Sequence, residues 1–173
     1  MKKIQTKTIV LYGLLVAVAF ILSYVESLVP AFFAVPGMKL GLSNLVVIVA
    51  LYLIGWKSAA AINLVRIVLA AILFGNLMSL AYSFAGALLS LTLMIILKKT
   101  GKFSTVVISI AGGVCHNIGQ IIVAMIVLNT KAIGWYLLIL WFTGVAAGAV
   151  IGIIGAILIK RLKPVFDKGL GRN

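Results

Sequence analysis

Acidic residues are almost missing from this chain of 173 residues. It has two, Glu26 and Asp167, against fifteen lysines and arginines. Acid–base catalysis by a pair of carboxylates needs two positioned acids, and Mg²⁺ on a diphosphate is held by carboxylate oxygens. Because Asp167 lies in the basic tail, neither arrangement is expected. We therefore predict that the chain is not an enzyme in its own right.

Cysteine and histidine are equally scarce, with one of each, Cys115 and His116. A single cysteine excludes an internal disulfide bond, and these two residues cannot supply the roughly four ligands of a structural metal site. The sequence also has no phosphate-binding loop of the Walker type and no hydrolase nucleophile motif. We therefore expect neither a metal nor an organic cofactor.

Charged residues of both signs make up 10% of the chain, whereas 64% of its residues are hydrophobic. Soluble domains average about 25% charged and 45–50% apolar residues, so this composition indicates an integral membrane protein. We expect one transmembrane domain over residues 1–173. The net charge of +13 does not indicate nucleic-acid binding, because the basic residues lie between hydrophobic stretches and not on one soluble face.

Six apolar stretches follow one another, separated by short polar or turn-forming segments. They cover Thr8–Leu28, Leu40–Trp56, Ser58–Phe74, Leu77–Leu97, Ser104–Leu128 and Ile133–Ile159. About 20 apolar residues cross a bilayer, and about 17 is the lower limit. The sequence therefore predicts an all-α, multi-pass membrane protein with six transmembrane helices.

The basic residues are distributed unevenly between the two sides of this predicted bundle. Twelve of the fifteen fall in segments expected on one side, and two, Lys39 and Lys131, fall in loops on the other. Lysine and arginine collect in cytoplasmic segments of membrane proteins. The asymmetry predicts that both termini are cytoplasmic.

The remaining basic residue, Arg66, interrupts the third apolar stretch. An arginine near the bilayer centre usually faces a bundle interior or a wet cavity, and by default it marks a functional site. From the helical rise, Arg66 lies roughly 12 Å from the inner face of a core about 30 Å thick. On the same measure Glu26 lies about 15 Å further out. We therefore expect Arg66 to lack a carboxylate partner in the protein and to bind a ligand anion or carbonyl.

Other polar residues are expected near the same depth or above it. The fifth stretch carries His116, Asn117 and Gln120, which share one broad helix face because they are spaced three and four residues apart. Asn44 lies near the outer end of the second stretch and Asn76 at the end of the third. With Lys39 at the rim, these residues predict a substrate site open to the outside, with Arg66 near its floor.

Each of these side chains also has a structural interpretation. For Arg66 it is a pair with backbone carbonyls or with Glu26, for Lys39 it is reaching toward the headgroups, and for the others it is hydrogen bonding between helices. The same ambiguity applies to the loop Val29–Lys39, which is apolar yet contains two prolines and a glycine. With Phe32 and Phe33 it is either a lid over the site or a segment that packs along the membrane.

Small residues at four-residue spacing mark two helix surfaces suited to close packing. One carries Gly13 and Ala17 in the first stretch. The other carries Gly144, Gly148 and Gly152 in the sixth. The second stripe is compatible with packing inside the chain or with a subunit interface.

Four segments, PGMKLGLSNLVVIVALYLIGWKSA, NLVRIVLAAILFGN, SLAYSFAGALLSL and GGVCHNIGQ, resemble a bacterial membrane family. It is known as the Gx transporter family or as heptaprenyl diphosphate synthase component I. This family looks like the substrate-binding S components of energy-coupling factor (ECF) transporters, which are six-helix bundles with an outward-facing vitamin site. The resemblance implies an S-component-like bundle in the bacterial plasma membrane. It also implies a coupling subunit and two ATPases as partners, docked at Gly13 and Ala17, which are similar to the usual Ala-x-x-x-Ala pair.

We therefore expect a substrate-binding membrane subunit for uptake of a small vitamin-like or anionic metabolite. The alternative is a non-transporting membrane subunit that holds isoprenoid, quinone or flavin-linked redox machinery at the membrane. A carrier that acts alone is a third class. Catalysis implied by the synthase name finds no support in the residues, because prenyl synthases need aspartate-rich Mg²⁺ sites and this chain has one aspartate, in its tail.

Overall fold

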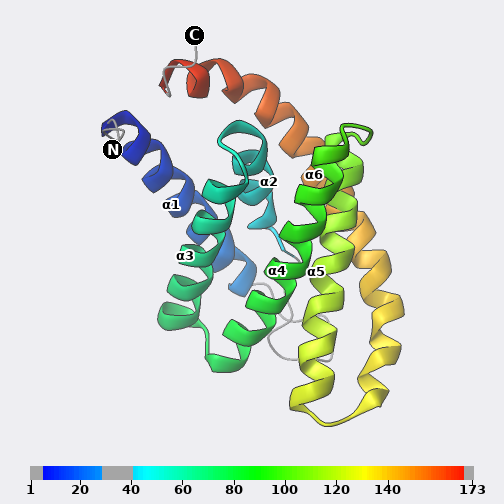
Figure 1. Cartoon of the computed structure of the whole chain (residues 1–173). Coiled ribbons are helices and arrows are strands. Elements are labelled where there is room, and N and C mark those ends of the chain that lie inside the picture. The colour runs from blue at the N-terminus through cyan, green and yellow to red at the C-terminus, as the bar shows by residue number, and fades with distance from the viewer. Residues whose placement is uncertain (1–5, 29–40, 170–173) are drawn as a thin grey trace.

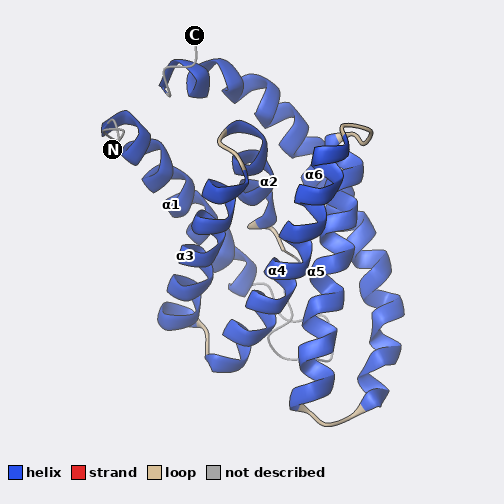
Figure 2. Ribbon diagram, viewed as in Figure 1, coloured by secondary structure: helices blue, strands red, loops and turns tan. Residues whose placement is uncertain are grey.

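The computed structural model describes residues 6–28 and 41–169, and this part of the chain is built from helices joined by short turns (Figures 1 and 2). The helices are α1 (Thr6–Leu28), α2 (Asn44–Leu53), α3 (Trp56–Phe74), α4 (Leu77–Thr100), α5 (Thr105–Val127) and α6 (Tyr136–Gly169), with a 3₁₀ turn η1 (Lys131–Trp135) before α6. The all-α prediction is confirmed for these residues. Lys39, Phe32 and Phe33 lie outside them, and so do the predicted lid and rim.

Five of the described helices, α1, α3, α4, α5 and α6, are long and apolar enough to cross a membrane. They make the chain a multi-pass membrane protein. Helix α2 has ten residues and is about 15 Å long, roughly half of a hydrocarbon core about 30 Å thick. The sequence predicted a transmembrane helix over Leu40–Trp56. The helix described there, α2, is shorter and reaches from one end of the bundle only to its middle (Figure 1).

The bundle consists of two halves. Helix α5 packs most extensively on α6 and α4, whereas α1 and α2 pack on α3, and α2 joins the halves by packing against α6. Close approach of α5 and α6 depends on the glycine stripe of α6, since a Cβ added to Gly148 would lie 2.7 Å from the Ile110 Cα. Gly144 and Gly152 meet α5 backbone at similar distances. This stripe therefore serves packing inside the chain. Helices α3 and α4 touch each other much less.

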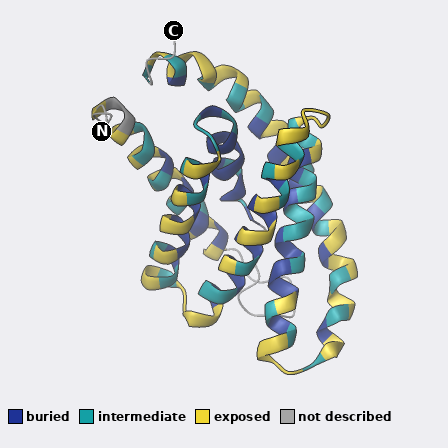
Figure 3. Ribbon diagram, in the orientation of Figure 1, coloured by how far each residue is buried: buried dark blue, intermediate teal, exposed yellow. Residues whose placement is uncertain are grey.

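Burial follows the arrangement of the helices (Figure 3). Helix α2 is enclosed, and all its residues except Leu45 and Tyr52 are buried. The outward faces of the longer helices carry large exposed apolar side chains, for example Ile72 and Ile126, each 72% exposed. Such a surface is suited to contact with lipid tails.

The two ends of the bundle differ in charge. The first described turn of α1 and the end of α6 lie at the same end (Figure 1). The α2–α3 and α4–α5 turns are at that end too, at Gly55 and Gly101, whose positive φ values of 109° and 67° suit glycine. The described lysines and arginines of this end are Lys57, Lys98, Lys99, Lys102, Lys160, Arg161, Lys163 and Lys168. At the opposite end, the described residues include one basic side chain, that of Lys131.

Candidate functional site

Arg66 lies at the junction of three helices, with 3% of its surface exposed. Its Nη1 donates to the Ser43 Oγ at 2.5 Å and to the Ser23 Oγ of α1 at 3.3 Å. Its Nη2 donates to the Asn63 Oδ1, one turn earlier on α3. The guanidinium therefore ties α1 and the amino end of α2 to α3.

The estimate that places Glu26 about 15 Å further out than Arg66 is wrong. The Glu26 carboxylate, which is 5% exposed, is close enough to interact electrostatically with the Arg66 guanidinium. The depth estimate failed because α1 and α3 do not begin at the same level. Ser23 of α1 touches Arg66, and Glu26 is only one turn beyond Ser23.

The amino end of α2 lies inside the bundle next to this pair. The backbone N–H of Gly41 donates to the Glu26 Oε1, and the turn from Gly41 leads directly into α2 at Asn44. Gly41 has a φ of 83°, and a Cβ there would lie 2.7 Å from the Asn44 Nδ2. The free N–H groups of a helix amino end carry partial positive charge. Glu26 and Arg66 thus both hydrogen-bond the turn at the start of a half-length helix.

His116 of α5 reaches the same turn from the other half of the bundle. The position of a Cβ on Gly41 is 3.9 Å from the His116 Cδ2. The ring packs against Gly86 of α4, where an added Cβ would lie 2.8 Å from the His116 Nδ1. We call the residues gathered around this turn the polar cluster: Ser23, Glu26, Gly41, Ser43, Asn44, Asn63, Arg66 and His116.

Gln120 lies one helical turn from His116 on α5 and is completely buried. Neither its Oε1 nor its Nε2 has a hydrogen-bond partner in the part of the chain that the structure describes. The same is true of the Arg66 Nε. A buried amide without a partner is costly, so groups of this kind usually bond water or a ligand.

Of the sequence-predicted site residues, the structure brings together Arg66, Asn44 and His116, with Gln120 one turn beyond. It directs Asn117 elsewhere, because the Asn117 Nδ2 donates to the Leu140 carbonyl of α6 at 2.6 Å. That hydrogen bond links α5 to α6.

Asn76 is exposed at the end of the bundle, where its Oδ1 accepts the Ser79 N–H at 2.8 Å and caps α4. The predicted docking residues Gly13 and Ala17 are exposed on α1, and nothing lies within 4 Å of a Cβ placed on Gly13.

Sequence reasoning did not assign Ser23 to the site, and it placed Glu26 at the rim, about 15 Å further out than Arg66. Small hydroxyls are common in transmembrane helices, so Ser23 carried no signal alone. Its spacing of three residues from Glu26, the one acid in the first stretch, places both on one helix face and could have indicated it.

The polar cluster offers one cation, one anion and several neutral hydrogen-bonding groups. Among residues 6–28 and 41–169, no group of three or more His, Cys, Asp or Glu side chains lies together. The chemistry that these side chains support is recognition of a polar group through hydrogen bonds and charge, away from bulk water.

Comparison with known proteins gives one family. The family model described as heptaprenyl diphosphate synthase component I matches residues 15–158, well over half of the chain. The search of curated proteins and the search of solved structures found no match. This match covers all of the polar cluster, the helices α2, α3, α4 and α5 in full, and parts of α1 and α6. The chain therefore belongs to the heptaprenyl diphosphate synthase component I family.

Proposed function

We propose that this protein is the substrate-binding membrane subunit of an ECF-type transporter for a small vitamin-like or anionic metabolite, and that the polar cluster binds the substrate. The observation that carries the proposal is the amino end of half-length α2, held inside the bundle beside Arg66. Irregular backbone at membrane depth is tolerated where it is buried in protein or lines a cavity. In many transporters the amino ends of discontinuous helices face substrate groups near the midplane.

The charges of the polar cluster narrow the substrate class. Arg66 already interacts with Glu26, so the cluster as a whole is close to neutral. This favours a ligand with one carboxylate or a few carbonyl groups over a polyanion such as a diphosphate. The Arg66 Nε and the Gln120 amide supply donors that the described residues do not use.

The remaining parts of the proposal concern topology and partners. The end of the bundle that carries most lysines and arginines is cytoplasmic, in a bacterial plasma membrane, with both termini on that side. The second of the six crossings includes α2. The protein is not an enzyme, and α1 docks a coupling subunit through its exposed Gly13–Ala17 surface, with two ATPases supplying energy.

Native mass spectrometry of the gently extracted protein tests the substrate site. We expect a tightly bound small molecule in the wild type, its loss in Asn44→Ala, and its retention in Asn76→Ala. The two variants make the same chemical change, but Asn44 is buried at the amino end of α2 whereas Asn76 is exposed. Equal ligand occupancy in both variants would show that the substrate does not bind at this turn.

The family name favours a second candidate, a non-transporting membrane subunit associated with a prenyl diphosphate synthase or with quinone or flavin-linked machinery. Co-purification separates the two. A coupling subunit with ATPases supports transport, whereas a soluble prenyltransferase or redox protein supports the alternative. Uptake by the isolated protein in ATP-free liposomes would contradict both.

A further inference from the structure

A lateral groove runs between α3 and α4, which touch each other much less than α4 and α5 do. Two cavities of ≈ 190 Å³ and ≈ 550 Å³ adjoin along it and share Leu64, Ile67 and Phe84 as lining residues. Asn63, Ala87, Leu88 and Leu91 also line the smaller cavity, and Leu77 and Ala81 also line the larger. The combined volume is in the range of ligand sites, about 300–1,000 Å³.

The groove opens toward the surroundings of the bundle. Leu64, Phe84 and Leu88 are each about half exposed at its rim, and Leu77 is 77% exposed. From Leu77 to Leu91 the wall contributed by α4 is about 21 Å long. This exceeds the roughly 15 Å of one leaflet of a core about 30 Å thick. One extended hydrocarbon chain therefore suits the groove.

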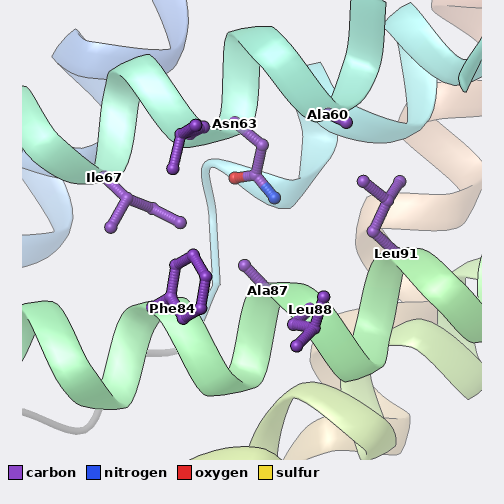
Figure 4. Close-up of a pocket in the computed structure, with 8 residues that line it drawn as sticks. Ala60, Asn63, Ile67, Phe84, Ala87, Leu88 and Leu91 are labelled. Carbon is purple, nitrogen blue, oxygen red and sulfur yellow. The ribbon is translucent and has the colours of Figure 1, made fainter. Parts of the chain in front are cut away.

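Among the described residues that line the groove, Asn63 is the one with a polar side chain. Its Oδ1 accepts a hydrogen bond from Arg66, while its amide nitrogen points into the space between α3 and α4 (Figure 4). The residue is 4% exposed, and Ile67, Phe84, Ala87 and Leu91 surround the amide with apolar surface (Figure 4). A donor in such surroundings favours an occupant that carries an acceptor.

The depth of Asn63 limits what that acceptor is. Asn63 lies seven residues into α3, about 10 Å from the amino end of that helix. A charged headgroup at this depth is costly, and Arg66, the nearest cation, is engaged behind Asn63 with Ser23, Ser43 and Asn63 itself. A small uncharged oxygen group, a carbonyl or a hydroxyl, carries no such cost.

We propose that the α3–α4 groove binds a neutral long-chain lipid from the bilayer, with its hydrocarbon chain along the groove and its terminal carbonyl or hydroxyl oxygen accepting a hydrogen bond from the Asn63 Nδ2. This site is distinct from the substrate site, although Asn63 touches both. It does not depend on the transport proposal.

Photolabelling in lipid nanodiscs tests it, with a diazirine-bearing octadecanol as the probe and mass spectrometry to locate the labels. We expect labels at Leu64 and Phe84. Excess octadecanol should compete with the probe about fivefold more effectively than octadecane does, because one neutral hydrogen bond changes an affinity by about that factor. Geranylgeraniol as a further competitor distinguishes a branched isoprenoid chain from a straight one. Labels at Leu89, on the lipid-facing side of α4, should not be competed.

Two variants test where the hydrocarbon chain of the lipid lies and where its oxygen binds. Ala81→Phe fills the groove and should lower labelling of Leu64 at least threefold, whereas Ala61→Phe, on the exposed side of α3 away from the groove, should not. Asn63→Leu should make octadecanol and octadecane equally effective. The proposal is overturned if groove labels resist competition as those at Leu89 do, if octadecane equals octadecanol in the wild type, or if Ala81→Phe leaves labelling unchanged.

Discussion

Arg66 and Glu26 hold adjacent parts of the same turn, Arg66 through the Ser43 hydroxyl and Glu26 through the Gly41 N–H. Replacing Arg66 by methionine would take the hydrogen-bond donor away from the buried Ser23, Ser43 and Asn63 oxygens. We therefore expect Arg66→Met to lower the free energy of unfolding by about 1–3 kcal/mol, the usual cost of leaving buried polar groups without their partner. Chemical denaturation in detergent measures this.

The control for this prediction is the double variant Arg66→Met/Glu26→Gln, which removes both charges. It should recover part of the lost stability if the Glu26 charge is stabilised by the nearby arginine, because the double variant removes the two charges together. If Arg66→Met alone is as stable as the wild type, Glu26 does not depend on the arginine.

His116 owes its position to the absence of a side chain at Gly86. A methyl group there would lie 2.8 Å from both the Nδ1 and the backbone oxygen of His116, so α4 and α5 would have to move apart. We expect Gly86→Ala to cost about 1–3 kcal/mol, as overpacking does in other cores. Thermal unfolding in detergent gives the comparison.

Gly13→Ala is the matched control, because Gly13 is also inside a helix but has open space around its Cβ position. Alanine there should be neutral or stabilise by up to about 1 kcal/mol. Equal effects at the two positions would contradict close packing at Gly86.

At the scale of single helices, Lys98 of α4 binds the carboxyl end of α2. Its Nζ donates to the Leu51 carbonyl at 2.6 Å and lies 4.7 Å from the centre of the Tyr52 ring. The last carbonyls of a helix lack partners within it, and cations nearby are favourable. Lys98→Met should therefore lower stability by about 1–2 kcal/mol.

Lys99→Met removes the same charge from the next residue, which is exposed, and should change stability by less than about 0.5 kcal/mol. Amide hydrogen exchange adds a local measure, since exchange in α2 should increase in Lys98→Met and stay unchanged in Lys99→Met. Similar exchange in both variants would mean that α2 does not need this lysine.

Hydropathy predicted the longer helices closely, for example Ser58–Phe74 against Trp56–Phe74 for α3. Hydropathy predicted too long a helix for α2, Leu40–Trp56 against Asn44–Leu53, because an apolar run does not show where helical hydrogen bonding begins and ends. It ended the sixth stretch at Ile159, whereas α6 continues to Gly169. Hydropathy falls after Ile159 because basic residues follow, but lysine and arginine are good helix formers, so the helix continues.

The sequence marked Arg66 as exceptional but could not identify its partners. Counting residues from the ends of the helices assumes that they start at one level, and the Ser23–Arg66 contact shows that they do not. Adjacent residues on a helix point about 100° apart. Periodicity therefore could not show that His116 packs on α4 while Asn117 bonds to α6.

For the whole molecule, the orientation in the membrane can be tested with single cysteines in a Cys115→Ala background. Thr100 lies at the basic end, and Asn129 lies at the opposite end, and both are exposed. With both termini cytoplasmic, a membrane-impermeant maleimide should label Asn129→Cys in intact cells. It should label Thr100→Cys only after the cells are permeabilised. Labelling of Thr100→Cys in intact cells contradicts this orientation.

Helix α6 is 34 residues long, about 51 Å, and exceeds the hydrocarbon core by about 20 Å. Its final segment carries the exposed Lys160, Arg161, Lys163 and Lys168 and bends across the end of the bundle toward α1 (Figure 1). Anionic headgroups attract each such residue by about 1 kcal/mol. We therefore expect the segment to lie along the lipid–water boundary, where its attraction to anionic headgroups would help to set how deep the bundle sits in the bilayer.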